Sequence, residues 1–165
     1  MFKGLKNLFS QEDKNKTTLK SPFHGQLIPL SEVNDITFSD EMVGKGAAVI
    51  PSEGYAVAPI DGNIVNAFKT GHAFTMVAEG GQEILVHIGL DTVNLKGEHF
   101  EVLVEDGQPI KQGEKVIKFD LEKLKELGYD VTSPVVICNS MDYTDVKGLG
   151  KKEVNFGDDI IEVVK

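Results

Sequence analysis

The sequence predicts an all-β protein, an antiparallel β-sandwich or barrel with a duplicated half-motif and one short helix. Three observations predict this class. From Leu19 onward, short apolar runs alternate with Gly, Pro, Asp and Asn, which is typical of strands joined by tight turns. The 165 residues include 17 glycines, which indicates many turns, and two sequence patterns each occur twice. A chain of this length forms one domain with a buried core.

Several short apolar runs are bounded by turn-forming residues and are expected to be strands. They are Gln26–Leu30, Ala47–Ile50, Asn63–Phe68, Ala73–Ala78, Ile84–Ile88, Phe100–Val104, Lys115–Phe119, Val135–Cys138 and Ile160–Val164. Gly80 and Gly81 are expected to form a hairpin turn, because glycine accepts a positive φ. One helix is expected over Leu121–Leu127, with Asp120 as its N-cap and Gly128 as its stop.

The duplicated patterns refine the architecture. Ser21–Leu27 and Ala58–Ile64 both read small-Pro-x-x-Gly-polar-aliphatic, and Ile110–Phe119 resembles Val154–Val163. Each pattern thus occurs twice, as if two similar half-barrels had been joined. A closed or sandwiched sheet of this kind leaves few exposed edges.

Residues 1–18 are expected to form a flexible leader ahead of a single domain over residues 19–165. The leader is polar and lysine-rich after residue 10, which is typical of a segment that does not pack. Phe2, Leu5, Leu8 and Phe9 share one helical face. That face belongs either to a frayed terminus or to an interfacial helix in weak contact with a membrane surface.

The composition excludes some classes of function. The formal net charge is −9, which argues against nucleic-acid binding because phosphate backbones require Lys and Arg. An acidic surface instead favours docking to basic protein partners. The single cysteine, Cys138, lies in an apolar run and is expected to be buried as a small hydrophobe. One thiol forms no internal disulfide, which fits a reducing, cytoplasmic location.

His87 is the most informative of the four histidines. Strand alternation places Ile84, Val86 and Ile88 on one face and puts His87 beside Leu85 on the other. A lone histidine in such a place is commonly a hydrogen-bonded structural residue. His24 and His99 lack such a setting and are expected to be surface or structural residues.

His72 changes the interpretation of His87. Antiparallel pairing about Gly80 and Gly81 brings His72 within one or two residues of His87, so the two imidazoles can face each other. Apolar surroundings lower a histidine pKa below its usual value of about 6.5. Both rings are then neutral at pH 7, and a neutral imidazole is a nucleophile.

Two stretches around this pair, Gly71–Thr75 and Glu83–Glu98, resemble the glucose-family IIA component of the bacterial sugar phosphotransferase system. The resemblance runs from about Leu19 to the C-terminus. It includes the segments Asp35–Phe38, Met42–Gly44, Val57–Gly62 and Ser133–Ile137. It implies an antiparallel β-sandwich with a duplicated half-motif, in agreement with the repeated patterns.

The resemblance also implies a phosphotransferase function. Such proteins accept a phosphoryl group from the histidine protein HPr and pass it to a cysteine of a IIB domain during sugar uptake. They require no cofactor, and some regulate other proteins through their phosphorylation state. The sequence leaves the sugar open among glucose, N-acetylglucosamine, trehalose and β-glucosides.

The same resemblance assigns roles to individual residues. His87 is implied to carry the phosphoryl group on Nε2, His72 to stabilise it during transfer and Thr70 to orient His72. The carbonyl of Gly89 is implied to fix the His87 tautomer. The residues implied to contact partner proteins are Asp35, Ile36, Phe38, Met42, Val43, Phe68, Leu85 and Asp91. Asn94 and Leu85 replace a glutamate and a phenylalanine of a familiar enterobacterial member, which leaves its regulatory partners open here.

Three other classes remain as alternatives. A zinc hydrolase would use the paired imidazoles as ligands, but catalytic zinc needs three protein ligands and the chain has no His-x-His pair. A third ligand supplied by a partner would make zinc an assembly device at the interface. A biotinyl or lipoyl carrier would need a Met-Lys-Met or Asp-Lys-Ala tip, which is absent. A pure interaction module would not need the pairing of His72 with His87.

Overall fold

A computed structural model describes residues 15–165, and most regular structure in them is β-strand. The strands are β1 (Lys16–Lys20), β2 (Gly25–Pro29), β3 (Lys45–Pro51), β4 (Tyr55–Val57), β5 (Gly62–Ala67), β6 (Ala73–Ala78), β7 (Glu83–His87), β8 (Phe100–Val102), β9 (Pro109–Ile110), β10 (Lys115–Phe119), β11 (Ser133–Ile137), β12 (Asp145–Gly148), β13 (Lys152–Val154) and β14 (Asp159–Val164). The short helices between them are α2 (Ile36–Ser39), α3 (Leu121–Glu126) and the 3-10 turns η1 (Leu30–Glu32), η2 (Thr92–Leu95) and η3 (Ser140–Asp142). The all-β prediction is confirmed.

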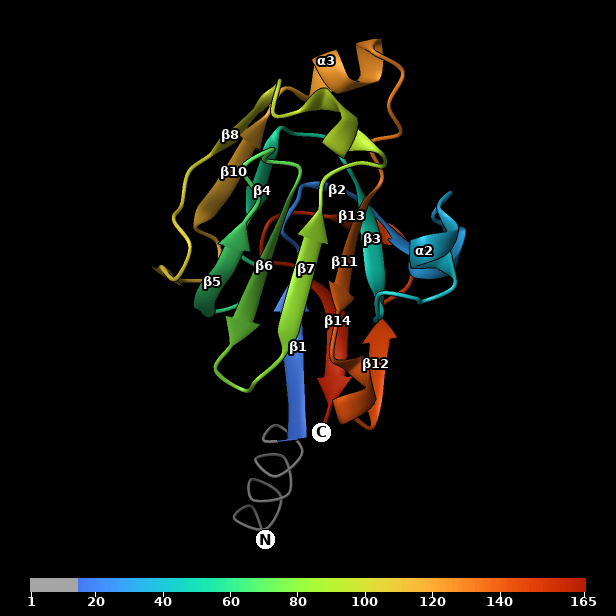
Figure 1. Cartoon of the computed structure of the whole chain (residues 1–165). Coiled ribbons are helices and arrows are strands. Elements are labelled where there is room, and N and C mark those ends of the chain that lie inside the picture. Colours follow the sequence, from blue (N-terminus) through green and yellow to red (C-terminus); the bar gives the residue numbers. More distant parts are fainter. Residues whose placement is uncertain (1–14) are drawn as a thin grey trace, which may run out of the picture.

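The strands of residues 15–165 form antiparallel sheets that enclose one core (Figure 1). The largest sheet has the order β13-β2-β3-β11-β7-β6-β5-β9, and two smaller sheets have the orders β1-β14-β12 and β4-β10-β8. Fully buried side chains from all of them meet inside: Leu19 and Ile161 from β1 and β14, Ile117 from β10, and Phe74 and Ile84 from the large sheet. Burial of this apolar surface is the main force that holds the sandwich together.

Strand β7 shows the predicted alternation. Ile84, Val86 and Ile88 are at most 1% exposed and belong to the core. Leu85 and His87 are partly exposed on the opposite face. The core face therefore anchors the strand, and His87 is left on its outer face.

The β6–β7 hairpin fixes the position of His72 relative to His87. The turn closes where the backbone N–H of Gly81, with φ 90°, donates to the carbonyl of Ala78. Ala73 then lies opposite His87, and His72 stands one residue beyond it. This register agrees with the prediction to within one residue.

The predicted helix is present as α3, and it ends one residue earlier than expected. The Asp120 side chain accepts a hydrogen bond from the backbone N–H of Lys123, and Gly128 has a φ of 87°. A second helix, α2, was not expected from the sequence because it makes only one turn. Asp35 caps it by accepting a hydrogen bond from the backbone N–H of Thr37.

Residues 16–18 belong to the domain and not to a leader, which corrects the prediction. They form most of β1, in which Thr17 pairs with Val163 and Leu19 with Ile161 of β14. The strand was not predicted because its sequence is polar and its pairing partner lies near the other end of the chain. The apolar face formed by Phe2–Phe9 lies outside the described residues and stays a prediction. No helix among residues 15–165 is long and apolar enough to span a membrane.

Cys138 is exposed, so the expectation that it is buried is wrong. Strand β11 ends at Ile137, one residue before the predicted end, and the chain turns outward after it. The backbone N–H of Cys138 donates to the carbonyl of Glu83 at 2.7 Å, which continues the pairing of β11 with β7 by one residue. The short strands β4, β9, β12 and β13 were also missed, because two to four residues carry little periodic signal.

The duplicated sequence patterns have structural counterparts. Gly25 and Gly62 each begin a strand, and in both places an added Cβ would lie about 2 Å from a carbonyl oxygen of the neighbouring strand. Gly113 and Gly157 precede β10 and β14 with nearly equal φ values of 89° and 90°. Glycine is required at these equivalent positions for the same physical reasons.

Candidate functional site

The imidazole rings of His72 and His87 lie side by side at one end of the β6–β7 hairpin. Their ring centroids are 5.2 Å apart and the ring planes meet at 76°. The main chain holds this arrangement, because the backbone N–H of Ile88 donates to the carbonyl of His72 at 2.7 Å. The structure thus brings together the two histidines that the hairpin register predicts to be neighbours.

The tautomer of His87 is fixed by the main chain. Its Nδ1–H donates to the carbonyl oxygen of Gly89 at 2.7 Å. In the neutral ring this places the proton on Nδ1 and leaves a lone pair on Nε2. The ring is partly exposed, so Nε2 is available to a reactant that approaches from outside.

His72 is held from behind by Thr70. The His72 Nδ1 and the Thr70 Oγ1 are 2.5 Å apart and share a hydrogen bond. The ring also packs edge-on against Phe68, with the centroids 5.3 Å apart, and His72 is only 6% exposed. Phe68 and Thr70 both contact His72, which is less exposed than His87.

Electrostatics keep both rings neutral at pH 7. Burial, and secondarily the neighbouring His87, lower the pKa of His72 from 6.5 to about 4. Burial also lowers the pKa of His87, although its hydrogen bond to Gly89 and the charges of Asp35 and Asp91 oppose this effect. The site therefore presents a neutral imidazole with a free nitrogen, which is a nucleophile.

An apolar rim surrounds His87. The Phe38 ring lies 5.3 Å from the His87 ring and is buried in a small cluster with Leu90 and Val136. Val43 and Leu85 pack against the same cluster. Two further residues that were expected to contact partners lie on or just after α2 and are open to solvent: Ile36 is 67% exposed and Met42 is 71% exposed.

The two acidic residues expected at the site are close enough to His87 to raise its pKa. Asp35 is fixed as the N-cap of α2. Asp91 adopts a left-handed φ of 60° at the start of η2, a conformation that aspartate tolerates better than most residues. Two carboxylates therefore lie near His87.

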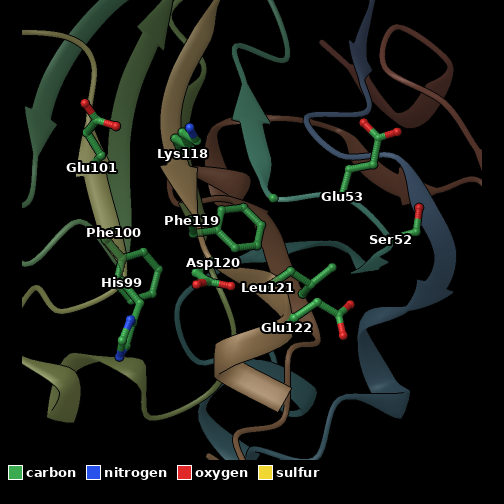
Figure 2. A pocket seen from close by; sticks show the side chains of 11 residues that line it. Ser52, Glu53, His99, Phe100, Glu101, Lys118, Phe119, Asp120, Leu121 and Glu122 are labelled. Carbon is green, nitrogen blue, oxygen red and sulfur yellow. The ribbon is translucent and has the colours of Figure 1, made fainter. Parts of the chain in front are cut away.

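The other two histidines lie elsewhere. The His24 and Phe156 ring centroids are 3.9 Å apart with the planes tilted by 46°, and the His24 Nδ1 accepts a hydrogen bond from the backbone N–H of Phe156. His99 lines a hollow of about 520 Å³, shown in Figure 2, together with Phe119 and exposed charged residues. This hollow contains neither His72 nor His87, so it is separate from the paired imidazoles.

No group of three or more His, Cys, Asp or Glu side chains within residues 15–165 is arranged to hold a metal ion. His72 and His87 supply two imidazole nitrogens and no third ligand from this part of the chain joins them. A catalytic zinc site needs three protein ligands, so the residues present do not fit the zinc-hydrolase alternative.

The sequence did not point to two buried hydroxyls that bond to the Ile88–Gly89 peptide group, next to the carbonyl that contacts His87. The Gly89 backbone N–H donates to Ser133 Oγ at 3.0 Å, and Thr92 Oγ1 donates to the Ile88 carbonyl at 2.5 Å. Both side chains are fully buried. The sequence signal was only a hydroxyl at the edge of an apolar run, which is too common to single out.

The fold is an antiparallel β-sandwich that carries a pair of neutral imidazoles at one end of its β6–β7 hairpin. The family described as phosphoenolpyruvate-dependent sugar phosphotransferase system, EIIA 1 matches residues 17–143. The chain belongs to this family and is a glucose-type IIA component of a sugar phosphotransferase system.

Similar proteins agree with this assignment. The glucose-specific EIIA component of Oceanobacillus iheyensis is 40% identical in an alignment of 165 residues that covers 99% of each chain. The glucose permease IIA structure from Mycoplasma capricolum superposes with a TM-score of 0.79 at 35% identity, over 89% of this chain and 95% of that one. The β-glucoside-specific EIIBCA component of Dickeya chrysanthemi is 39% identical over 147 residues, 89% of this chain but 23% of that longer protein.

Proposed function

We propose that this chain is a phosphohistidine carrier. It accepts a phosphoryl group from phospho-HPr on Nε2 of His87 and passes it to the cysteine of a IIB domain of a sugar permease. The observation that carries the proposal is the hydrogen bond from His87 Nδ1–H to the Gly89 carbonyl, which leaves Nε2 unprotonated beside the second imidazole.

In the first step, the Nε2 lone pair attacks the phosphorus of the donor phosphohistidine. A new N–P bond forms as the donor N–P bond breaks, and the donor imidazole leaves with the bonding electron pair. His87 keeps its proton on Nδ1 throughout, because that proton is bonded to the Gly89 carbonyl. Transfer of this kind depends mainly on in-line positioning and on stabilisation of charge.

His72 supplies the charge stabilisation. When the Thr70 hydroxyl donates to Nδ1, the proton of the neutral ring sits on Nε2 and can donate to a phosphoryl oxygen. Because its pKa is about 4, His72 stays neutral at pH 7 and does not place a positive charge beside His87. A neutral donor stabilises the moving group and does not hold it too tightly for onward transfer.

In the second step, a cysteine thiolate of the IIB domain attacks the phosphorus. The S–P bond forms, the N–P bond breaks and His87 returns to its starting state. A partner that covers Phe38, Ile36 and Met42 would exclude water, which would otherwise hydrolyse the phosphohistidine. The EIIBCA relatives join parts named IIB and IIA in one protein, which supports a IIB partner.

The charges at the rim support HPr as the donor. Asp35 and Asp91 would attract an arginine on the approaching face of HPr. No cofactor is needed for these steps. Zinc would bind only where a partner supplies a third ligand to the two imidazoles.

The carrier is further proposed to act in the cytoplasm and to regulate partner proteins through its phosphorylation state. Phosphorylation would add about two negative charges to the apolar face around His87. The N-terminal segment with Phe2, Leu5, Leu8 and Phe9 is proposed to add weak affinity for a membrane surface.

Incubation with phosphoenolpyruvate, enzyme I and HPr, followed by site mapping with mass spectrometry, tests the proposal. The chain should gain one phosphoryl group on His87. His87→Ala should gain none, while His24→Ala, which removes a histidine away from the site, should be phosphorylated like the wild type. A phosphoryl group mapped to another residue, or retained in His87→Ala, would overturn the proposal.

A further inference from the structure

The Ile88–Gly89 peptide group is held at both ends by buried hydroxyls. Thr92 Oγ1 donates to the carbonyl of Ile88 at 2.5 Å, and the N–H of Gly89 donates to Ser133 Oγ at 3.0 Å. Thr92 and Ser133 are 0% exposed, so water does not compete for either bond. This peptide plane is therefore fixed by two side chains from different parts of the fold.

The next peptide group, Gly89–Leu90, is the one that contacts His87. Its carbonyl accepts the His87 Nδ1–H at 2.7 Å, and its N–H donates to the carbonyl of Asp130 at 2.8 Å. The two planes meet at Gly89, whose φ is 70°. A Cβ there would lie 2.8 Å from Thr92 Cγ2, so only glycine allows this close approach.

Ser133 is well placed to act as a fixed acceptor. It begins β11, and its hydroxyl donates to the carbonyl of Val131 at 2.8 Å, which leaves a lone pair for the Gly89 N–H. Strand β11 also pairs with β7, with Val135 opposite Val86. The acceptor is thus anchored to the strand that carries His87.

We propose that Ser133 and Thr92 are positioning residues for phosphoryl transfer. Their hydroxyls hold the Ile88–Gly89 plane, this plane sets the direction of the Gly89 carbonyl, and that carbonyl keeps the His87 proton on Nδ1. The consequence is that Nε2 is free and aimed outward before any partner arrives. The transfer role rests on the proposed function; the effect on the His87 tautomer does not.

The chain contains a matched control for a merely structural hydroxyl. Ser140 is 8% exposed, donates to the carbonyl of Ile137 and accepts the backbone N–H of Lys45 at 2.8 Å. It thus bonds two backbone groups in the same manner as Ser133, but no described hydrogen bond joins it to Gly89 or His87. Loss of either hydroxyl should reduce stability, and only loss of Ser133 should alter the His87 ring.

Nitrogen-15 NMR of the unphosphorylated chain above pH 7 tests the proposal through the tautomer of His87. The wild type should show one tautomer, protonated on Nδ1. Ser133→Ala should give a mixture of the two tautomers, because the Gly89 N–H loses its acceptor and the adjoining peptide planes turn. Ser133→Thr should restore one tautomer, Thr92→Val should resemble Ser133→Ala, and Ser140→Ala should resemble the wild type.

Phosphoryl transfer from HPr gives the second readout. Ser133→Ala should lower kcat by about tenfold, the lower end of the loss that outer hydrogen-bond partners produce at other sites, with an unchanged KM because Ser133 is buried away from the docking face. A single wild-type tautomer in both Ser133→Ala and Thr92→Val would overturn the inference, as would an equal tautomer shift in Ser140→Ala. A wild-type chain that is not phosphorylated on His87 would instead overturn the proposed function, and the tautomer would still decide the inference.

Discussion

His72 lies in a place that disfavours a proton. Its ring is 6% exposed and lies beside His87, and its pKa is lowered from 6.5 to about 4. In the unfolded chain the pKa returns to its ordinary value. Between pH 6.5 and pH 4 the unfolded state therefore binds a proton that the folded state does not. Protonation of His72 in the unfolded state therefore lowers the free energy of unfolding as the pH falls from 6.5 toward 4. Above pH 6.5 this loss is absent.

We predict that His72→Gln loses less stability in acid than the wild type. Between pH 6.5 and pH 4 the free energy of unfolding of the wild type should fall by about 2 kcal/mol more than that of the variant. Urea unfolding at both pH values measures the difference. His24→Gln is the control, and it should follow the wild type. Equal losses in the wild type and His72→Gln would show that His72 does not titrate in this range.

The same substitution should separate the two transfer steps. His72→Gln keeps the His87 nucleophile, so it should still accept phosphate from HPr. Because the donor to the phosphoryl oxygens is lost, transfer to the IIB cysteine should slow by about 10²-fold. Rapid-quench measurement of both half-reactions decides this. A His72→Gln variant that accepts no phosphate from HPr would mean that the roles of the two histidines are reversed.

At the residue scale, local sequence predicted the His87 environment well. Strand alternation placed Leu85 and His87 outside and Val86 inside, as the structure shows. The cover over His72 was not predictable in this way. It depends on the Phe68 ring and on the turn at Gly71. Phe100, which is distant in the sequence, packs against this turn.

At the scale of elements, the turn before β6 determines where His72 points. Gly71 has a φ of 68°, and an added Cβ would lie 2.5 Å from the Cβ of Phe100. The turn therefore combines a left-handed backbone with close packing. Neither property is visible in the short pattern around the glycine, because Phe100 reaches it only through the tertiary fold.

Gly71→Ala and Gly107→Ala should separate the effect of the left-handed backbone on stability from the effect of close packing. Gly107 has a similar φ of 82°, but nothing lies within 4 Å of an added Cβ. We expect Gly107→Ala to lower the free energy of unfolding by about 1 kcal/mol through backbone strain alone. Gly71→Ala should lose a further 1 to 3 kcal/mol, roughly, through overpacking against Phe100. Urea unfolding measures the free energy of both variants. Equal losses would mean that Phe100 moves aside with no loss of stability.

Elements with a local signal were predictable and those without one were not. The β6–β7 hairpin and α3 carry their own turn and cap residues, Gly81 and Asp120, and both were found. Strand β1 is polar at Lys16–Thr18 and pairs with β14 from the opposite end of the chain. Such a strand is defined by its partner, so its sequence alone resembled a leader.

At the scale of the whole molecule, the sandwich carries the proposed phosphoryl-transfer site on its outer face. The main core joins side chains from all the sheets of residues 15–165, including Leu19 of β1, and Leu124 of α3 also packs into it. The site lies on the outer face of β6 and β7 and beside α2, above this core. Phosphorylation should therefore change charge locally and leave the fold unaltered.

Amide chemical shifts before and after phosphorylation measure this prediction. Large changes should be confined to the ends of β6 and β7, the Gly89 loop and α2. Strand β12 should be unaffected, because it lies away from the end of β7 that carries His87 (Figure 1). Large changes that reach β12 would show that a global rearrangement carries the signal.

The nitrogen of His87 that carries the phosphoryl group tests the central claim most directly. The His87 Nδ1–H donates a hydrogen bond to the Gly89 carbonyl, so phosphorylation by HPr should occur on Nε2. Nitrogen-15 NMR of the phosphorylated chain distinguishes the two ring nitrogens. We predict that phosphorus is bonded to Nε2 and that the proton stays on Nδ1. Phosphorus on Nδ1 of His87, or on His72, would show that the hydrogen bond to Gly89 does not determine where phosphorylation occurs.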